Sequence, residues 1–331
     1  DTVNTSAAVT GRDSTASAAQ YIGGLLGVGV GAFNNVTGSG AVTVSNTDPT
    51  LATGASTALS IHSVGGLVGQ LAPTASMTLA NNINTGSVTV TTATATAAGT
   101  AATTFYSITD VGGLIGTLGG SAVSATANWR VTLTDSSTSG NVSVASTTAA
   151  SMSNHLTFIA KYTGGLIGRV DYAGVAGMSF GGDLTLTNLS SSGSVSGYSG
   201  VGGLVGASNV AGNTGVSNVF RNLSATGNVT GFGDTAVNIA VSSSTNPTFS
   251  TLGVGGLFGA NTGTKVGLLQ NSHYTGDILS KGGSFIGGLM GAGTGQVDNS
   301  YAIGTLSVPA TSFPVGISGN TTYPVGAIEI G

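Results

Sequence analysis

Apolar and polar residues alternate along many short segments of this chain. In residues 41–44, 87–90, 129–134 and 183–187, Val or Leu occupies every second position and most residues between them are Thr or Ser. A period of two with many β-branched residues is typical of β-strands. No segment shows an apolar stripe with a period of 3.6 residues and helix caps at its ends. The pattern therefore predicts an all-β fold.

A six-residue phrase recurs seven times, beginning at residues 22, 64, 111, 163, 201, 254 and 286. After an apolar residue or threonine come two glycines, an invariant leucine, a second apolar residue and a third glycine; we call this the Gly-Gly-Leu phrase. Neighbouring residues of a regular strand face opposite sides. Either both faces of this strand are covered, or the glycines form a bulge that turns both apolar side chains inward. We predict that the leucines form the core of the repeats: Leu25, Leu67, Leu114, Leu166, Leu204, Leu257 and Leu289.

A second phrase, the turn phrase, follows each copy of the first. It is an Asn or Asp with a glycine five residues later and an apolar residue two positions after that glycine. Asn and Asp tolerate left-handed backbone geometry and bond their own backbone. On stacked coils such side chains can also form an amide ladder. We predict repeat turns at Asn35, Asn81, Asp135, Asn188, Asn222, Asn271 and Asn299.

Together the two phrases predict a β-solenoid, or β-helix-like repeat protein, with seven repeats of the type GGLxG…N-x5-G-x-V. Successive copies are 32 to 53 residues apart, so insertions of variable length emerge at the corners. One repeat cannot bury its apolar face alone, so the repeats must stack. We expect a half-repeat or edge strand at 1–20, suggested by the turn-like spacing from Ser6 to Gly11. The seven-repeat solenoid follows at 21–308, and the C-terminal tail at 309–331 is a candidate assembly strand.

Composition narrows the possible partners. Charged residues make up 5 % of the chain, the net charge is −4, and the seven basic residues are scattered. The chain therefore offers no basic patch for nucleic acid or an anionic membrane. It contains no cysteine, which excludes disulfides and thiolate metal sites, and no apolar run long enough for a transmembrane helix. Asp1 is either a mature N-terminus left after cleavage of a leader or simply where the sequence begins.

Candidate chemistry is sparse. His62, His155 and His273 lie in separate repeats without metal-ligand spacing, and we expect solvent-facing or loop histidines. The acidic residues are spread singly, although stacked coils could bring distant ones together. An acid–base cluster on one face would be needed for a polysaccharide-active β-helix enzyme. We therefore predict no catalytic residues, no cofactor and no metal site.

Several Asn-x-Ser/Thr sequons occur in the chain. Those at Asn35, Asn188 and Asn222 belong to the turn phrase, where we expect a structural and buried asparagine. Asn4 and Asn320 lie outside the repeats and are the better candidates for glycosylation in a secreted protein.

The two phrases together resemble the GLUG repeat family, which joins a Gly-Gly-Leu-apolar-Gly run to an Asn-Ser/Cys-Tyr-Ala-Thr-Gly-x-Val run. The closest copies are residues 271–276 (NSHYTG), 299–304 (NSYAIG) and 222–229 (NLSATGNV), and the resemblance spans about residues 20–308. The early repeats depart from it, with Thr or Ser where the tyrosine would stand. Members of the family are mostly parts of large bacterial and archaeal surface proteins, including adhesins and some secreted proteases. The resemblance implies a β-solenoid outside the cell, serving as a stalk or adhesive surface, and no active site.

We therefore expect a non-enzymatic extracellular structural protein, either a self-assembling surface filament subunit or an adhesin stalk. Its partner would be a further copy of itself, stacked head to tail, or a larger surface assembly. A carbohydrate- or surface-binding adhesive module is the alternative, and glycans would then be the ligand. Clustering of Trp129, Tyr172, Tyr198 and Phe232 on one exposed face would favour that alternative, whereas dispersal or burial would favour the structural role. A polysaccharide-active β-helix enzyme is the third possibility.

Overall fold

The computed structural model describes residues 3–12, 20–46, 58–92, 104–119, 130–146, 156–172, 183–210, 218–232, 253–261, 267–281, 285–308 and 329–330. Within these ranges every regular element is a β-strand, and all named strand pairs are parallel. The strands form four sheets, A to D. The prediction of an all-β, solenoid-like fold is confirmed.

Each sheet collects one strand, or two short ones, from successive turns of the chain. Sheet A contains β1 (Val3–Thr5), β5 (Val36–Gly38), β9 (Met77–Ala80), β10 (Ile83–Asn84), β14 (Arg130–Thr134), β15 (Ser137–Thr138), β19 (Asp183–Ser191), β23 (Asn218–Ala225), β27 (Gly267–Gln270), β28 (His273–Tyr274), β32 (Gly295–Asp298) and β33 (Tyr301–Ala302). Sheet B contains β2 (Val9–Arg12), β6 (Val42–Asn46), β11 (Val88–Thr92), β16 (Val142–Ser146), β20 (Val195–Gly197), β24 (Val229–Gly231), β29 (Ile278–Ser280) and β34 (Leu306–Ser307).

Sheets C and D complete the wall, the name used here for the four sheets that enclose the core. Sheet C contains β3 (Gln20–Gly23), β7 (Ala58–Gly65), β12 (Thr104–Gly112), β17 (Leu156–Gly164), β21 (Ser199–Gly202), β25 (Val254–Gly255), β30 (Phe285–Gly287) and β35 (Glu329–Ile330). Sheet D contains β4 (Leu26–Gly29), β8 (Val68–Leu71), β13 (Ile115–Gly119), β18 (Ile167–Tyr172), β22 (Val205–Val210), β26 (Phe258–Asn261) and β31 (Met290–Gly293).

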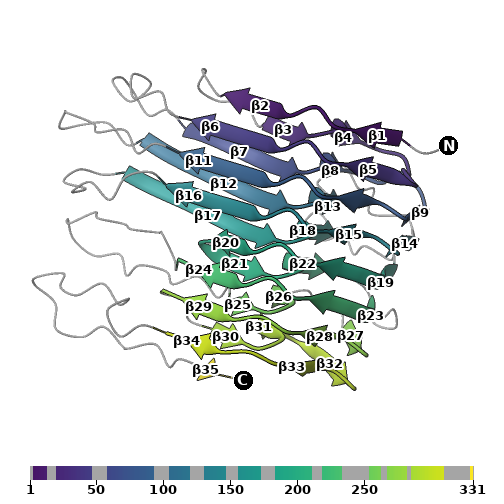
Figure 1. Cartoon of the computed structure of the whole chain (residues 1–331), viewed down its shortest axis with the longest axis vertical. Coiled ribbons are helices and arrows are strands. Elements are labelled where there is room, and N and C mark those ends of the chain that lie inside the picture. Colours follow the sequence, from purple (N-terminus) through teal and green to yellow (C-terminus); the bar gives the residue numbers. More distant parts are fainter. Residues whose placement is uncertain are drawn as a thin grey trace, which may run out of the picture.

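The chain visits the sheets in the order A, B, C, D, and we call one such circuit a coil. Coil 1 is β1–β4, coil 2 is β5–β8, and β32–β35 start coil 8. Figure 1 shows the coils stacked along the long axis, from the N-terminal coil at the top to the C-terminal strands at the bottom. The first glycine of each Gly-Gly-Leu phrase pairs with the first glycine of the next copy, from Gly23 opposite Gly65 to Gly255 opposite Gly287. Repeats of unequal length are thus brought into one register.

The core lies inside the wall and follows the alternation seen in the sequence. In β14, Val131 and Leu133 are buried whereas Thr132 and Thr134 are partly exposed. Burying apolar surface stabilises a fold by about 25 cal/mol per Å². These inward apolar side chains therefore make the main favourable contribution of each coil to the stability of the fold. The core therefore runs as one continuous column through the stack.

The first strands fill the N-terminal edges of sheets A and B. Gly11 pairs with Val44, in the middle of β6, rather than with the glycine of a turn phrase. The spacing from Ser6 to Gly11 is therefore not a copy of that phrase, and this part of the sequence interpretation was wrong. At the other end, β35 pairs with β30 of the same chain. Residues 309–328, the larger part of the expected assembly tail, lie outside the described residues.

Candidate functional site

The Gly-Gly-Leu phrase forms the corner between sheets C and D. In coil 2, β7 ends at Gly65 and β8 begins at Val68. The N–H groups of Leu67 and Val68 both donate to the carbonyl oxygen of Leu114 in the next coil, each at 3.0 Å. Two successive donors sharing one acceptor mark a local bend. The bend turns both side chains inward, and both are fully buried.

The last glycine of the phrase sets how closely sheets C and D pack. A Cβ on Gly168 would lie 2.5 Å from backbone atoms of Asp110 and Val111 in the preceding coil and 2.6 Å from the Gly116 oxygen. Real Cβ atoms do not approach backbone this closely, so only glycine fits. Sheet D therefore lies directly against the backbone of sheet C.

The predicted core leucines lie in the interior, with different exposure along the stack. Leu25 and Leu289, in the first and last copies of the phrase, are only partly buried, although they pack against the core. The other five are completely buried: Leu67, Leu114, Leu166, Leu204 and Leu257.

The predicted turn residues form a column along sheet A. All seven have positive φ, between 44° and 57°. Several of their side chains form a ladder in which an asparagine Nδ2 group donates to the preceding coil, as from Asn188 to Asp135 at 2.8 Å and from Asn222 to Asn188 at 2.9 Å. All seven are exposed, so the expectation that the sequon asparagines among them are buried was wrong. These side chains lie on the outer surface of the wall, where the hydrogen bonds of the ladder are open to solvent.

A buried polar column lies inside the solenoid, level with the Gly-Gly-Leu corners. Asn84 donates to the carbonyl oxygen of Gly113 at 2.7 Å, and Thr138 donates to that of Gly165 at 2.7 Å. In coil 7 this position is Tyr274, the tyrosine of the GLUG-like copy, which is 1 % exposed and donates to the Asp277 carbonyl oxygen at 2.9 Å. Early and late repeats thus use different side chains at one interior position.

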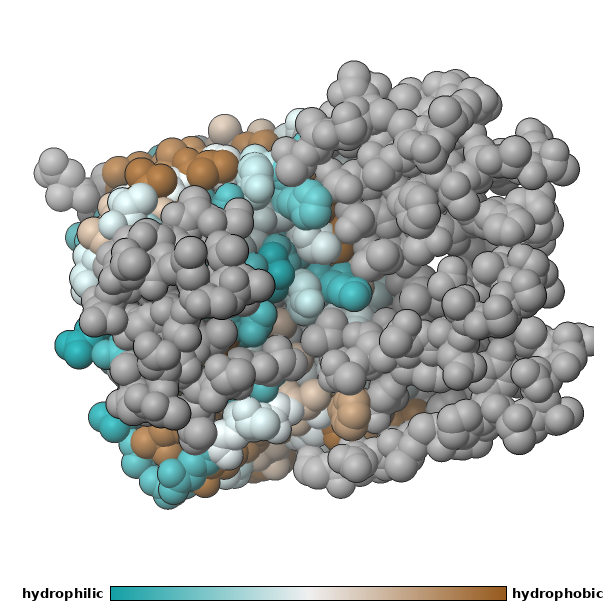
Figure 2. Space-filling view, turned by 180° about the vertical axis from the view of Figure 1, so that it is seen from behind, coloured by the Kyte–Doolittle hydropathy of each residue, from teal (hydrophilic) through white to brown (hydrophobic). Residues whose placement is uncertain are grey.

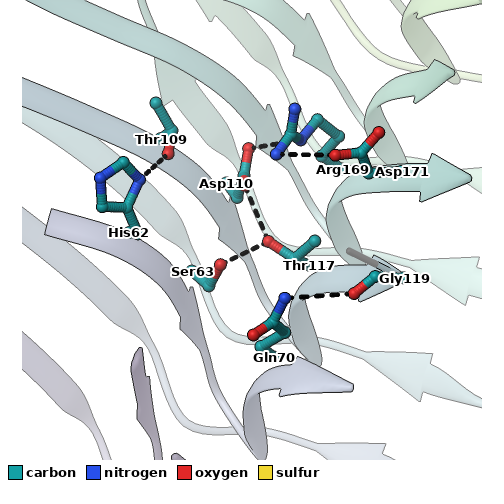
Figure 3. A network of polar contacts seen from close by, with 9 residues as sticks. All are labelled: His62, Ser63, Gln70, Thr109, Asp110, Thr117, Gly119, Arg169 and Asp171. Atoms are coloured by element: carbon teal, nitrogen blue, oxygen red, sulfur yellow. Dashed lines mark hydrogen bonds and ion pairs between the residues drawn. The ribbon is translucent and has the colours of Figure 1, made fainter. Parts of the chain in front are cut away.

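The principal cluster of charged side chains lies between sheets C and D (Figure 3). Asp110 on β12 forms an ion pair with Arg169 on β18, with 3.0 Å between Oδ1 and Nε. Arg169 also contacts Asp171, at 3.1 Å. Thr117 donates to Asp110 at 2.8 Å and hydrogen-bonds Ser63 in the preceding coil. The cluster connects sheet C of coils 2 and 3 with sheet D of coils 3 and 4.

Burial dominates the electrostatics of this cluster. It raises the pKa of Asp110 to about 6, and the charge of Arg169 and the Thr117 hydrogen bond only partly oppose that shift. Burial, followed by the Arg169 charge, lowers the pKa of His62, which hydrogen-bonds Thr109 at 2.9 Å. The side chain of Asp110 is 3 % exposed, so a dissolved substrate has little access to it. The arrangement links coils and responds to pH.

This cluster could not be identified from the sequence. Asp110 and Asp171 are 61 residues apart and meet only because stacking brings β12 beside β18. Ser63, Asp110 and Tyr162 share a positive φ at equivalent positions just before the Gly-Gly-Leu phrase. Since these three residues are chemically unlike, the position carries no recognisable signature. Tyr162 adds a cation–π contact, with its ring centre 5.2 Å from the Arg169 guanidinium carbon.

The aromatic residues suggested for carbohydrate binding are divided. Tyr172 is buried, with 2 % exposure, and Trp129 lies outside the described residues. Tyr198 and Phe232 lie together where β20 and β24 end, with ring centres 5.2 Å apart and planes tilted by 56°. The Lys281 ammonium group lies 5.4 Å from the Phe232 ring centre. Two of the four aromatics thus form a half-exposed pair beside a cation.

The remaining candidates are dispersed. His273 stacks on Tyr301 of the next coil, with 5.4 Å between ring centres, and His155 lies outside the described part of the chain. Asn4 is exposed on β1, and Asn320 also lies outside the described residues. In the described ranges, no group of three His, Asp or Glu side chains could hold a metal ion.

None of the described segments forms a helix with the length and apolar character needed to cross a membrane. Comparison of the chain with protein-family models, with curated proteins and with solved structures found no match.

Proposed function

We propose that this chain is a non-enzymatic structural protein of the cell exterior, built from seven GLUG-type repeats. It serves as a surface filament subunit or an adhesin stalk. The supporting observation is the register of the repeats. Copies of the Gly-Gly-Leu phrase and of the turn phrase, although unequally spaced in the sequence, align along one axis. Backbone hydrogen bonds, the leucine column and the amide ladder hold them in this alignment. Such a stack transmits force along its axis through many parallel interactions. Variation is confined to insertions between the strands.

Electron microscopy tests this proposal. Immunogold labelling of producing cells with antibodies against the folded chain should place gold particles outside the cell envelope, on fibres or stalks. Negative staining of the purified chain should show straight rods. Labelling confined to the cell interior would contradict the proposal.

A carbohydrate-binding adhesive module is the second candidate, favoured by the Tyr198–Phe232 pair and Lys281. Aromatic rings next to cations and hydroxyl groups suit the apolar faces and hydroxyls of sugars. A glycan array probed with the wild type and with Phe232→Ala tests it. Loss of a specific signal in the variant supports binding at this pair, whereas an array without specific signals contradicts it.

The third candidate, a polysaccharide-active β-helix enzyme, would be supported by three carboxylates converging in a groove. Within the described residues, Asp110 and Asp171 instead both form ion pairs with Arg169, whose single positive charge compensates one of the two carboxylates. The structural role therefore remains the preferred proposal.

A further inference from the structure

Exposed apolar side chains gather at the two ends of the stack. Among the described residues, nine large apolar side chains are exposed, and eight lie at an end. Figure 2 shows the corresponding apolar surface at the top and bottom of the molecule, with hydrophilic residues between them. The N-terminal set is Val3, Tyr21, Leu26, Val28 and Val30; the C-terminal set is Val297, Tyr301 and Ile303. The ninth, Ile83, lies in coil 3.

The N-terminal exposure has a specific structural cause. Each later D strand lies against the C strand of the preceding coil, as β13 lies against β7 and β18 against β12. β4 has no such strand beneath it among the described residues. Val28 pairs with Gln70, which pairs with Thr117; Thr117 is 1 % exposed whereas Val28 is 50 % exposed. The D strand of the first coil thus lacks a covering C strand from a preceding coil among the described residues.

The C-terminal end presents the complementary arrangement. β35 continues sheet C by one strand beyond β30, and no described D strand of a later coil covers it. The same end has an open hollow of about 520 Å³ next to the last Gly-Gly-Leu phrase, lined by Leu289, Met290, Tyr301 and Ile303 among others. This end therefore offers a C strand that lacks a covering D strand.

We propose that these two ends bind each other in successive copies of the chain, giving a head-to-tail filament. β1, β2 and β3 of one copy continue sheets A, B and C from β33, β34 and β35 of the next, and β4 covers β35. A second copy is the fitting occupant because it presents the same four sheets, in the same order and with the same strand direction. Repeating the same head-to-tail contact along the filament then covers both ends of every inner copy, as in any open heterologous assembly.

The proposal rests on the structural role proposed above, and it also specifies the register. Val9 and Thr10 align with Val42 and Thr43, while Leu306 and Ser307 align with Ile278 and Leu279. Continuation of sheet B places Thr10 of one copy beside Ser307 of another.

Disulfide trapping in the full chain tests this register, because the wild type has no cysteine. Adjacent strands place paired Cα atoms about 5 Å apart, within the range that a disulfide bridges. In a single chain, Thr10 and Ser307 are separated by seven coil spacings, about 34 Å at the usual strand separation. The double variant Thr10→Cys/Ser307→Cys, oxidised at moderate concentration, should give a ladder of covalent oligomers on non-reducing gels. The two single variants should give dimers at most.

Two matched controls separate the end contact from general stickiness. Thr10→Cys/Ser143→Cys places the second thiol in the same column at mid-stack, where neighbouring coils cover it, and should give no ladder. In the double-cysteine background, Val28→Lys should reduce the ladder at least tenfold, whereas Ile83→Lys, at the exposed apolar side chain away from the ends, should leave it unchanged. Circular dichroism verifies folding of each variant.

A folded Thr10→Cys/Ser307→Cys protein that stays monomeric would overturn head-to-tail stacking. Equal ladders from both mid-stack and end pairs would also overturn it. If the monomeric chain is nonetheless labelled outside the cell, the structural role stands as a stalk and only the stacking fails.

Discussion

The inner coils and the end coils are built from the same phrases but differ in what covers them. Leu166 in coil 4 is completely buried, whereas Leu25 at the same position in coil 1 is only partly buried. Thr117 is almost inaccessible, whereas Val28, in the corresponding place on β4, is half exposed. The comparison shows that the burial of a side chain in this solenoid depends on the neighbouring coils, because each coil packs against the coil before it and the coil after it.

The largest difference is expected for glycines at the sheet contacts. Gly168→Ala would place a methyl group 2.5 Å from backbone of the preceding coil, whereas a Cβ on Gly31, beyond β4, meets nothing within 4 Å. We expect Gly168→Ala to lower the free energy of unfolding by about 4 kcal/mol or more, because backbone cannot move aside without separating the sheets. Gly31→Ala should change it by less than about 0.5 kcal/mol. Urea unfolding followed by circular dichroism measures both, and equal effects would contradict the close packing.

Truncation of the leucine column should give the next largest difference. Leu166→Ala removes a fully buried side chain and leaves a cavity, which costs about 3–4 kcal/mol. Leu25→Ala removes a partly exposed one, and about 1 kcal/mol is expected. The same unfolding experiment applies, with an unchanged dependence on urea concentration as the check on cooperative unfolding. A Leu25 effect as large as that of Leu166 would show that coil 1 is covered in solution.

The sequence revealed the parts of the fold that repeat and missed those that depend on stacking. Alternation and the Gly-Gly-Leu phrase predicted an all-β solenoid-like fold, which is confirmed. The number of sheets could not be counted from the sequence. One sheet can take two short strands from the same coil, as sheet A takes β9 and β10 or β14 and β15, and these strands are separated by only a few residues. The Asp110–Arg169 ion pair was hidden because it joins different coils. No periodic pattern marks a contact that occurs once.

The burial of Asp110 makes an inner part of the stack sensitive to pH. The pKa of Asp110 is raised from 3.8 to about 6, so the folded chain binds a proton there that the unfolded chain has released between those values. Stability from this group is fully present below about pH 4 and is lost as the pH rises through about 6. Two pKa units correspond to a loss on the order of 2–3 kcal/mol.

Thermal unfolding between pH 4 and pH 7 should show this loss in the wild type but not in Asp110→Asn. His62 acts in the opposite direction, because its lowered pKa removes stability as the pH falls below about 6.5. The difference between the two proteins at each pH therefore isolates Asp110, since both retain His62. Identical pH profiles would contradict a raised Asp110 pKa. Coil 1, whose described D strand carries Val28 at the position of Arg169, should contribute no such dependence.

The smallest effect is expected for the amide ladder on the outside of the wall. Asn188 donates to Asp135 and accepts from Asn222, whereas Asn299 is shown only donating to Asn271. Both residues have positive φ, at 54° and 44°, which alanine adopts at a cost of about 1 kcal/mol. We expect Asn188→Ala to destabilise the fold by about 1–2 kcal/mol and Asn299→Ala by about 1 kcal/mol, the difference being the second exposed hydrogen bond.

Replacement by glycine separates the effect of backbone strain from the effect of losing the side-chain hydrogen bonds, because glycine adopts positive φ without strain. Asn188→Gly should therefore recover most of the stability that Asn188→Ala loses while still lacking the side-chain bonds. The hydrogen bond from Asn188 is the first cause of the lowered pKa of Asp135, followed by that from Thr134. In Asn188→Gly, nuclear magnetic resonance titration should accordingly show the Asp135 pKa moving up towards its ordinary value. An unchanged Asp135 pKa in this variant would mean that the ladder does not persist in solution, and that the left-handed turn alone accounts for the asparagines of the turn phrase.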